Sequence, residues 1–208
     1  MADQAKLYAK TKLPTVFGEF DVRVYREGEV EHLAISCGVI EGASNLAVRI
    51  HSECLTSEAL GSLKCDCKAQ LDTALSRIQE LGRGVVLYLR QEGRGIGLGN
   101  KIRAYALQED GADTVDANLM LGFHEDLRSY DGAAAMLKDM GVQSVELMTN
   151  NPKKIEGLAA AGFEVTGRSS CVAGVTADNL EYIETKRERM GHMIQDEDLD
   201  SVVDLKVN

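Results

Sequence analysis

The chain has 208 residues, of which 44% are hydrophobic and 27% charged, and it carries a formal net charge of −10. A chain of this length buries about 70% of its unfolded surface, and its composition excludes a disordered or collagen-like protein. It has no apolar run of the ~18 residues that a membrane span needs and no apolar secretory leader, so we expect a cytoplasmic protein without a membrane partner. The excess of acidic over basic side chains, 33 against 23, argues against a nucleic-acid partner.

The first fifty residues are typical of antiparallel β-strands. Apolar and polar residues alternate over residues 16–25, and further strands are expected at 32–40 and 46–50. Helices and strands then alternate along the chain. The expected elements are helix 71–81, strand 85–89, helices 100–108 and 132–140, strand 144–148, helix 152–161, strand 163–166 and helix 179–190.

This order of elements predicts a mixed α/β (α+β) fold, with a β-rich antiparallel N-terminal part followed by alternating strands and helices. No Pro- or Ser-rich linker interrupts it, so we expect one compact domain over residues 1–192. The segment 193–208 holds five acidic side chains and one lysine, which predicts a disordered acidic tail.

Five cysteines in a chain without a secretory leader argue for metal or thiol chemistry and against a disulfide framework. Three of them, Cys54, Cys65 and Cys67, precede the first long helix in a segment too polar for a core. Three thiolates fill three corners of a tetrahedral zinc site and leave the fourth for water, as in catalytic zinc sites. His51 and Asp66 are the nearest candidates for a fourth protein ligand, and three buried thiols without metal are the plain alternative.

Two further segments are suited to anions. A glycine-rich loop, residues 91–101, follows a buried strand and carries Arg94 and Lys101, but it matches neither the dinucleotide fingerprint nor a P-loop. An ordinary strand-to-helix turn explains this loop equally well. The second segment begins a helix with Asn151 as N-cap and Pro152 in the first turn, where free N–H groups and Lys154 attract an anion.

Five separated motifs occur in one order along the chain. They are Arg49-Ile50-His51-Ser52-Glu53-Cys54, Cys65-Asp66-Cys67, Gln91-Glu92-Gly93-Arg94, Lys101-Ile102-Arg103-Ala104-Tyr105 and Thr149-Asn150-Asn151-Pro152-Lys153-Lys154. Together they resemble GTP cyclohydrolase II over residues 12–192. The resemblance implies a stand-alone, homodimeric enzyme that opens the imidazole ring of GTP and releases formate and diphosphate, the first step of riboflavin synthesis. It also implies one Zn²⁺ per chain at the three cysteines and Mg²⁺ on the triphosphate.

The resemblance implies roles for individual residues as well. Asp126 matches the family's proton acceptor, Arg128 its proposed nucleophile toward the α-phosphorus, and Tyr105 a residue near the reacting carbon. The residues that match GTP contacts of the family are Arg49, Ile50, His51, Ser52, Glu53, Gln70, Glu92, Gly93, Arg94, Thr114, Thr149 and Lys154.

The residue types agree with this chemistry. The imidazole carbon lies between two nitrogens and is an electrophile for water on zinc, and Tyr105 or a carboxylate can supply the protons. Asp126 and Arg128 are two apart and point the same way on an extended segment, so the carboxylate can hold the guanidinium. Because a guanidinium keeps its proton, we expect Arg128 to clamp charge that develops on phosphorus. The plain alternatives are a surface ion pair and a core tyrosine.

A separate hypothesis concerns whether the enzyme releases formate after it opens the ring. Formate release requires a second hydrolysis after ring opening, and Met120 lies just before Asp126 in the sequence. A thioether orients water poorly, so we hypothesise that the enzyme keeps part or all of the formyl group on its pyrimidine product. The alternative is that Met120 fills a gap in the packing.

Two other functions stay open on the sequence alone. A zinc nucleobase deaminase fits His51-Ser52-Glu53, but its second half requires Pro-Cys-x-x-Cys, whereas the chain has Cys65-Asp66-Cys67. Such an enzyme releases ammonia instead of formate. A non-catalytic, nucleotide-binding regulatory module would keep the cysteines and turn over no GTP.

Overall fold

The structure, a computed structural model, describes residues 4–124 and 126–199, with only the backbone of Thr114. By their contacts the residues divide into two compact units. The first unit comprises Met1–His51, Leu71–Arg90 and Ser129–Cys171, and the second comprises Ser52–Gln70, Gln91–Arg128 and Val172–Asn208. The single domain expected over residues 1–192 stays a prediction, because a division by contacts does not show whether either unit folds alone.

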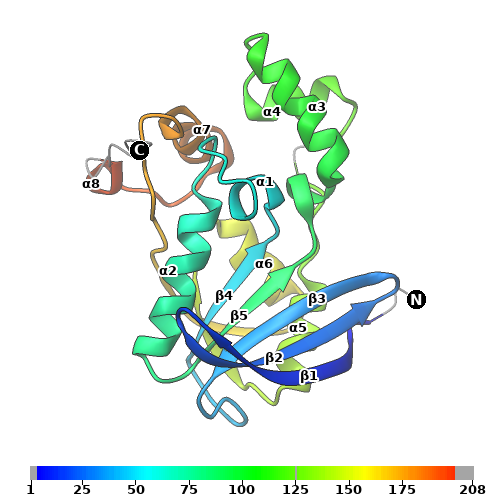
Figure 1. The fold of residues 1–208 in the computed structure, drawn as a ribbon, viewed down its shortest axis with the longest axis vertical. Helices are drawn as coiled ribbons and strands as arrows, with labels where there is room; N and C mark the ends of the chain where they lie inside the picture. Colours follow the sequence, from blue (N-terminus) through cyan, green and yellow to red (C-terminus); the bar gives the residue numbers. More distant parts are fainter. Residues whose placement is uncertain (1–3, 125, 200–208) are drawn as a thin grey trace. The chain divides into compact units, whose positions relative to one another are not determined.

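One mixed sheet organises the first unit (Figure 1). Within the described residues it has seven strands in the order β1-β2-β3-β5-β4-β6-β7. Their bounds are β1 (Lys6–Thr15), β2 (Gly18–Glu27), β3 (Val30–Cys37), β4 (Leu46–Ser52), β5 (Gly84–Leu89), β6 (Ser144–Met148) and β7 (Glu164–Ser169). The pairs β1–β2, β2–β3 and β3–β5 are antiparallel, whereas β4–β6 and β6–β7 are parallel. The predicted antiparallel start and the α/β fold class are therefore confirmed.

Helices cover both faces of this sheet. They are α2 (Cys67–Glu80), α5 (Asp131–Asp139) and α6 (Pro152–Ala160). Val86 and Leu87 are neighbours in β5 and therefore point to opposite faces. Leu87 joins the apolar cluster that includes residues of α5 and α6, whereas Val86 joins the cluster that includes residues of α2. The strand is buried on both sides, as the apolar run 85–89 predicts.

The second unit is mostly helical. Its elements are α1 (Leu55–Glu58), the start of α2, the 3₁₀ helix η1 (Glu92–Gly95), α3 (Gly97–Glu109), α4 (Thr114–Met120), α7 (Leu180–Met190) and α8 (Asp196–Leu199). Val175, Ile183 and Ile194 form a small apolar cluster that packs α7 against its flanking segments. Asp113 caps α4, because its Oδ1 accepts hydrogen bonds from two backbone N–H groups of the first turn at 2.7 and 2.8 Å.

Several elements differ from the expected pattern. The sequence does not predict β1, because all ten of its residues are exposed and no apolar alternation marks it. Instead of one strand over 16–25, a turn at 16–17 separates β1 from β2. Within the tail expected to be disordered, α8 is helical and Ile194 is buried, while residues 200–208 lie outside the described residues. None of the described helices combines the length and apolar composition that crossing a membrane requires.

Candidate active site

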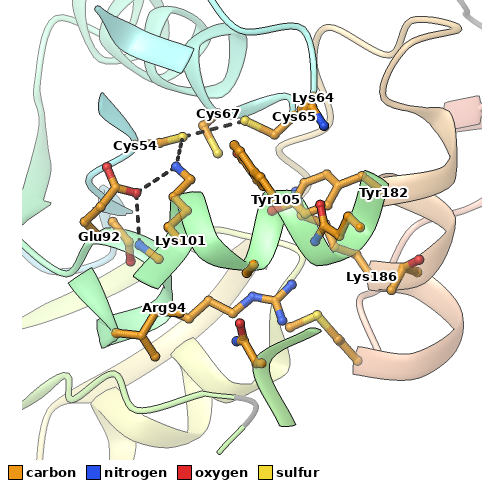
Figure 2. Close-up of a pocket in the computed structure, with 18 of the residues that line it drawn as sticks. Cys54, Lys64, Cys65, Cys67, Glu92, Arg94, Lys101, Tyr105, Tyr182 and Lys186 are labelled. Atoms are coloured by element: carbon orange, nitrogen blue, oxygen red, sulfur yellow. Dashed lines mark hydrogen bonds and ion pairs between the residues drawn. The ribbon is translucent and has the colours of Figure 1, made fainter. Parts of the chain in front are cut away.

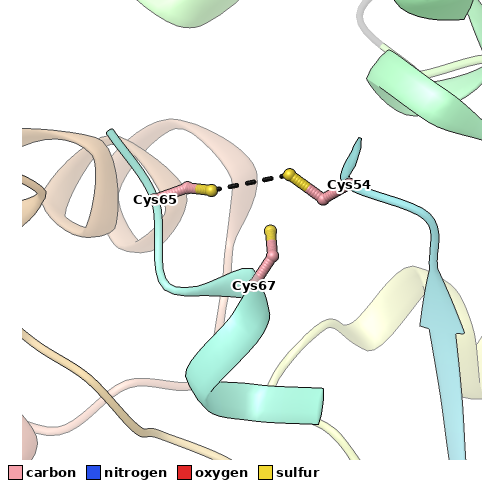
Figure 3. A group of neighbouring side chains, drawn as sticks. All are labelled: Cys54, Cys65 and Cys67. Carbon is pink, nitrogen blue, oxygen red and sulfur yellow. Dashed lines mark hydrogen bonds between the residues drawn. The ribbon is translucent and has the colours of Figure 1, made fainter. Parts of the chain in front are cut away.

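The three cysteines predicted as metal ligands come together in the second unit. Cys54 precedes α1, Cys65 lies in the following loop, and Cys67 begins α2. Their sulfur atoms all lie within 4.8 Å of one another, and the Cys54 and Cys65 sulfurs are 3.6 Å apart (Figure 3). Sulfurs at about 2.3 Å from a tetrahedral zinc ion are about 3.8 Å apart, so this spacing fits such an ion.

The surroundings of Cys54 favour a thiolate. Its Sγ accepts a hydrogen bond from the Lys101 ammonium at 3.0 Å (Figure 2). Hydrogen bonds from Cys65 and Cys67 and the charge of Lys101 hold the pKa of the Cys54 thiol far below its ordinary value, despite its burial. The hydrogen bonds to Cys54, with burial, raise the pKa of the thiols of Cys65 and Cys67. Because a bound metal ion requires thiolates, binding at this cluster releases protons.

Glu92 holds Lys101 in this position. The carboxylate is buried, and its Oε1 accepts hydrogen bonds from Lys101 Nζ at 2.7 Å and from the N–H of Gly93 at 2.9 Å. Its Oε2 accepts from the N–H of Leu55, in the first turn of α1, at 2.7 Å. Burial acts to lower the pKa of Lys101, but Glu92 and Cys54 raise it more, so the ammonium stays charged. Glu92, predicted as a substrate contact, therefore orients Lys101 and the turn that follows Cys54.

Lys101→Met removes the ammonium between Cys54 and Glu92. We expect the affinity of the folded protein for its metal ion to fall about 10- to 100-fold, as for other partners of metal ligands, measured by competition with a chromophoric chelator. Lys64→Met is the matched control, because its amino group also lies over the Tyr105 ring, at 5.2 Å against 5.7 Å, but its side chain is 47% exposed. An unchanged affinity in Lys101→Met would contradict this role.

The three sulfurs open onto a cavity of about 300 Å³ within the second unit. Of the residues predicted to act in catalysis or to contact substrate, those that line it are Ser52, Glu53, Glu92, Gly93, Arg94, Tyr105 and Arg128. Tyr105, on α3, is half-buried, and burial raises the pKa of its phenol. A second tyrosine, Tyr182 of α7, also lines the cavity, and burial raises its pKa to about 12. Both phenols therefore keep their protons at neutral pH.

Arg94 presents an unused cation to this cavity. Its Nη1 and Nη2 are buried and have no hydrogen-bond partner among the described residues. Its backbone is left-handed, with φ 60° and ψ 32°, an unusual conformation for a side chain of this size. Gly93 before it has φ 60° as well, and a Cβ there would lie 3.0 Å from Ile96 Cγ1 and 3.1 Å from Lys101 Cβ. A strained backbone that aims a guanidinium with hydrogen-bonding capacity left at Nη1 and Nη2 into a cavity is typical of a site for an anionic ligand.

Asp126 and Arg128 form a buried bidentate ion pair. Arg128 Nε donates to Asp126 Oδ1 at 2.8 Å, and Nη2 donates to Oδ2 at 2.6 Å. The side chains are 9% and 10% exposed, so the pair is not the surface ion pair of the plain alternative. Burial acts to raise the pKa of Asp126, but the hydrogen bonds and charge of Arg128 lower it below its ordinary value. The carboxylate thus stays ionised and fixes the guanidinium, which also lines the cavity.

The other predicted contacts lie in the first unit and are Arg49, Ile50, His51, Thr149 and Lys154. Arg49 is buried and its Nη1 donates to the carbonyl of Met148 at 2.8 Å. Lys154 Nζ donates to the carbonyl of Ile50 at 2.7 Å. Thr149 Oγ1 accepts from the N–H of Asn151 at 3.1 Å, and the His51 ring stacks on Tyr88 at 5.6 Å. Their contacts with a substrate stay predictions of the resemblance.

Gln70 and Met120 are not among the described residues that line the cavity, and the position of the Thr114 side chain is not described. Gln70 donates to the carboxylate of Asp66 at 2.6 Å. Thr114 begins α4, and its side chain lies outside the described residues. Met120 ends α4, is 65% exposed and is not among the cavity-lining residues. Its position gives the hypothesis of a retained formyl group no structural support.

Helix α7 supplies residues that sequence reasoning missed. Tyr182 and Lys186 of α7 line the cavity, and Lys186 pairs with Asp66. Nothing in the sequence marks these residues, because Lys186 lies 120 positions after its partner. The pairing also shows that Asp66 is not a fourth metal ligand: among the described residues, no carboxylate joins the three sulfurs.

Comparison with known proteins agrees with this geometry. A family model described as GTP cyclohydrolase II matches residues 6–170. A GTP cyclohydrolase-2 from Shewanella amazonensis is 50% identical over 194 residues, which cover 92% of this chain and 95% of that protein. One from Acinetobacter baumannii (strain SDF) is 52% identical over 194 residues, covering 91% of this chain and 96% of that protein. One from Teredinibacter turnerae is 50% identical over 187 residues, covering 89% and 94%.

Proposed function

Because the chain belongs to the GTP cyclohydrolase II family, we propose that it hydrolyses GTP, opening the imidazole ring and releasing formate and diphosphate in riboflavin synthesis. The observation that carries the proposal is a cavity whose lining residues suit both a metal ion and a phosphate group. Three converging sulfurs suit a Lewis-acidic ion. The guanidinium of Arg94, without a hydrogen-bond partner at Nη1 and Nη2 among the described residues, suits a phosphate.

We propose Zn²⁺ for the three cysteines, because thiolates with an open fourth position suit this ion in a catalytic site. A bound zinc ion supplies Lewis acidity that activates water at neutral pH. Lys101 offsets part of the negative charge of the three thiolates, since its ammonium lies 3.0 Å from the Cys54 sulfur. We place Mg²⁺ on the triphosphate, because Mg²⁺ is usually bound by substrate phosphates and few carboxylates.

Other residues of the chain bind phosphate and move protons. Arg94 and Arg128 neutralise the triphosphate. Asp126 holds Arg128 by two hydrogen bonds, so the guanidinium needs no reorganisation when charge develops on the α-phosphorus. Tyr105 keeps its proton at neutral pH and can donate it to a departing ring nitrogen.

Product analysis tests this proposal. We expect mass spectrometry and assays of the small products to find a diaminopyrimidine ribonucleotide with equimolar formate and diphosphate. Formate below that amount, with a formylated pyrimidine, would support the variant reaction suggested by Met120. Ammonia in place of formate would identify a deaminase, and no turnover by the metal-loaded protein would identify a regulatory module. Either of these last two results would contradict the proposal.

Arg94→Asn removes the cation while asparagine tolerates the left-handed backbone. We expect the KM for GTP to rise about 10- to 100-fold, because a charged hydrogen bond contributes about 1.5–3 kcal/mol. Steady-state kinetics measure this, with Arg103→Ala as control, since that exposed guanidinium donates a hydrogen bond to Asn100 Oδ1 at 3.2 Å. An equal KM in the two variants would show that Arg94 does not bind the substrate.

The homodimer stays a prediction of the resemblance, and the cytoplasmic location stays a prediction from the composition of the sequence. Sedimentation of the purified chain tests the dimer, and fractionation of cells tests the location.

A further inference from the structure

Asp66 lies between two proposed metal ligands, and both of its carboxylate oxygens accept hydrogen bonds. Its side chain is 4% exposed. Its Oδ1 accepts a hydrogen bond from Lys186 Nζ at 2.5 Å, and its Oδ2 accepts one from Gln70 Nε2 at 2.6 Å. Because Asp66 is the single residue between Cys65 and Cys67, a rotation of its backbone moves both sulfurs. The backbone conformation of Asp66 therefore affects the relative positions of these two sulfurs.

Lys186 is the charged partner of this carboxylate. It lies on α7, beyond the residues 6–170 that the family model matches. Its side chain is 10% exposed, and its ammonium lies 4.3 Å from the centre of the Tyr182 ring. A buried carboxylate without its cation is strongly destabilised, so the loop would turn to bring Asp66 to water.

The helix that carries Lys186 has other anchors in the second unit. Ile183 is fully buried in the small apolar cluster. Arg189 pairs with Asp113, the cap of α4, and its Nη2 lies 3.1 Å from Asp116 Oδ1. These contacts do not involve Lys186. Loss of its ammonium therefore leaves α7 packed and removes one defined interaction with the loop.

We propose that Lys186 is a positioning residue of the metal centre: through Asp66 it holds the Cys65–Cys67 segment in the conformation in which the sulfurs converge on Cys54. Helix α7 thus contributes to the metal site without supplying a ligand. This inference rests on the proposed function, because it requires that the three cysteines bind a metal ion.

The test compares Lys186→Met with Arg187→Met. Arg187 is the next residue of the same helix, and its ion pairs are with two exposed acidic side chains, Asp196 at 2.7 Å and Glu188 at 3.8 Å. Zn²⁺ and Co²⁺ affinities are measured without GTP by competition with a chelator, with the cobalt absorption spectrum as a second readout. We expect about 10- to 100-fold weaker binding and an altered spectrum in Lys186→Met, and no change in Arg187→Met. Unchanged metal affinity in folded Lys186→Met would overturn the proposal.

Two further variants separate positioning from folding. Lys186→Arg keeps a cation and should recover most of the affinity. Asp66→Asn combined with Lys186→Met removes both charges, so it avoids an isolated buried carboxylate if the single variant does not fold. We expect its loss of affinity to be smaller than the product of the two single losses, because the residues act through one contact. A loss of affinity in the double variant equal to the product of the two single losses would show that Lys186 does not act through Asp66.

The wild-type titration distinguishes this inference from the proposed function. If the wild-type chain binds neither Zn²⁺ nor Co²⁺ at the cysteines, the proposed metal centre itself is wrong. If the wild type binds and Lys186→Met binds equally well, only the role of Lys186 is wrong.

Discussion

Replacing Cys54, Cys65 or Cys67 by serine is expected to abolish metal binding and to lower GTP turnover by more than about 100-fold. Changes to the partners of metal ligands already cost about 10- to 100-fold, and loss of a ligand thiolate leaves two sulfurs for the ion. We expect the fold to survive, because neither apolar cluster of the sheet contains these cysteines. Metal content, turnover and thermal unfolding measured on the same samples check both expectations.

Cys37→Ser is the control for these variants. Cys37 lies in the apolar cluster next to α2, and its thiol donates to the carbonyl of Ile78 at 3.1 Å, which a serine hydroxyl can also do. We expect this variant to lose stability but to keep its metal ion and its turnover. Wild-type turnover in a metal-free Cys54→Ser protein would contradict the assignment of the metal centre.

Arg128→Ala is expected to lower kcat by about 100- to 1,000-fold, the usual cost of removing a preorganised donor to developing charge. The change in KM should be smaller, because the substrate carries less charge at the reacting phosphorus than the transition state does. Pre-steady-state measurement of diphosphate release, together with steady-state kcat and KM, checks whether kcat changes more than KM.

Arg128→Lys is the conservative comparison for that variant. A lysine keeps the charge but cannot form the two parallel hydrogen bonds that Asp126 now accepts. We expect an intermediate kcat, which would show that orientation contributes beyond charge. A raised KM with an unchanged kcat in Arg128→Ala would instead make Arg128 a binding residue.

Local sequence signals predicted much of the fold and part of the site. The apolar run at β5 and the amphipathic period of α2 each come from burial of residues that are close together in the chain, so the order of apolar residues predicts both elements. The cap of α6 was predictable because it is a contact between residues two positions apart: Asn151 Oδ1 accepts a hydrogen bond from the N–H of Lys153 at 2.9 Å. The cysteine cluster was predictable because three thiols in a polar segment have few structural uses.

The features that sequence reasoning missed depend on contacts between distant residues. The exposed strand β1 exists by pairing with β2, and its own residues show no burial pattern. The pairing of Asp66 with Lys186 joins segments that no motif connects. The left-handed conformation of Arg94 depends on how η1 turns into α3. Sequence alone does not show that its Nη1 and Nη2 have no hydrogen-bond partner among the described residues.

Titration of the metal-free chain with Zn²⁺, with GTP ring opening followed at each addition, tests whether the three cysteines hold the ion that the reaction requires. Protein is first stripped by a chelator and shown to be folded and without metal. We expect no ring opening at the start, a linear rise with added Zn²⁺, and saturation at one ion per chain, with no rise in Cys65→Ser. Full turnover of the stripped protein, or a rise of equal size in Cys65→Ser, would contradict this expectation.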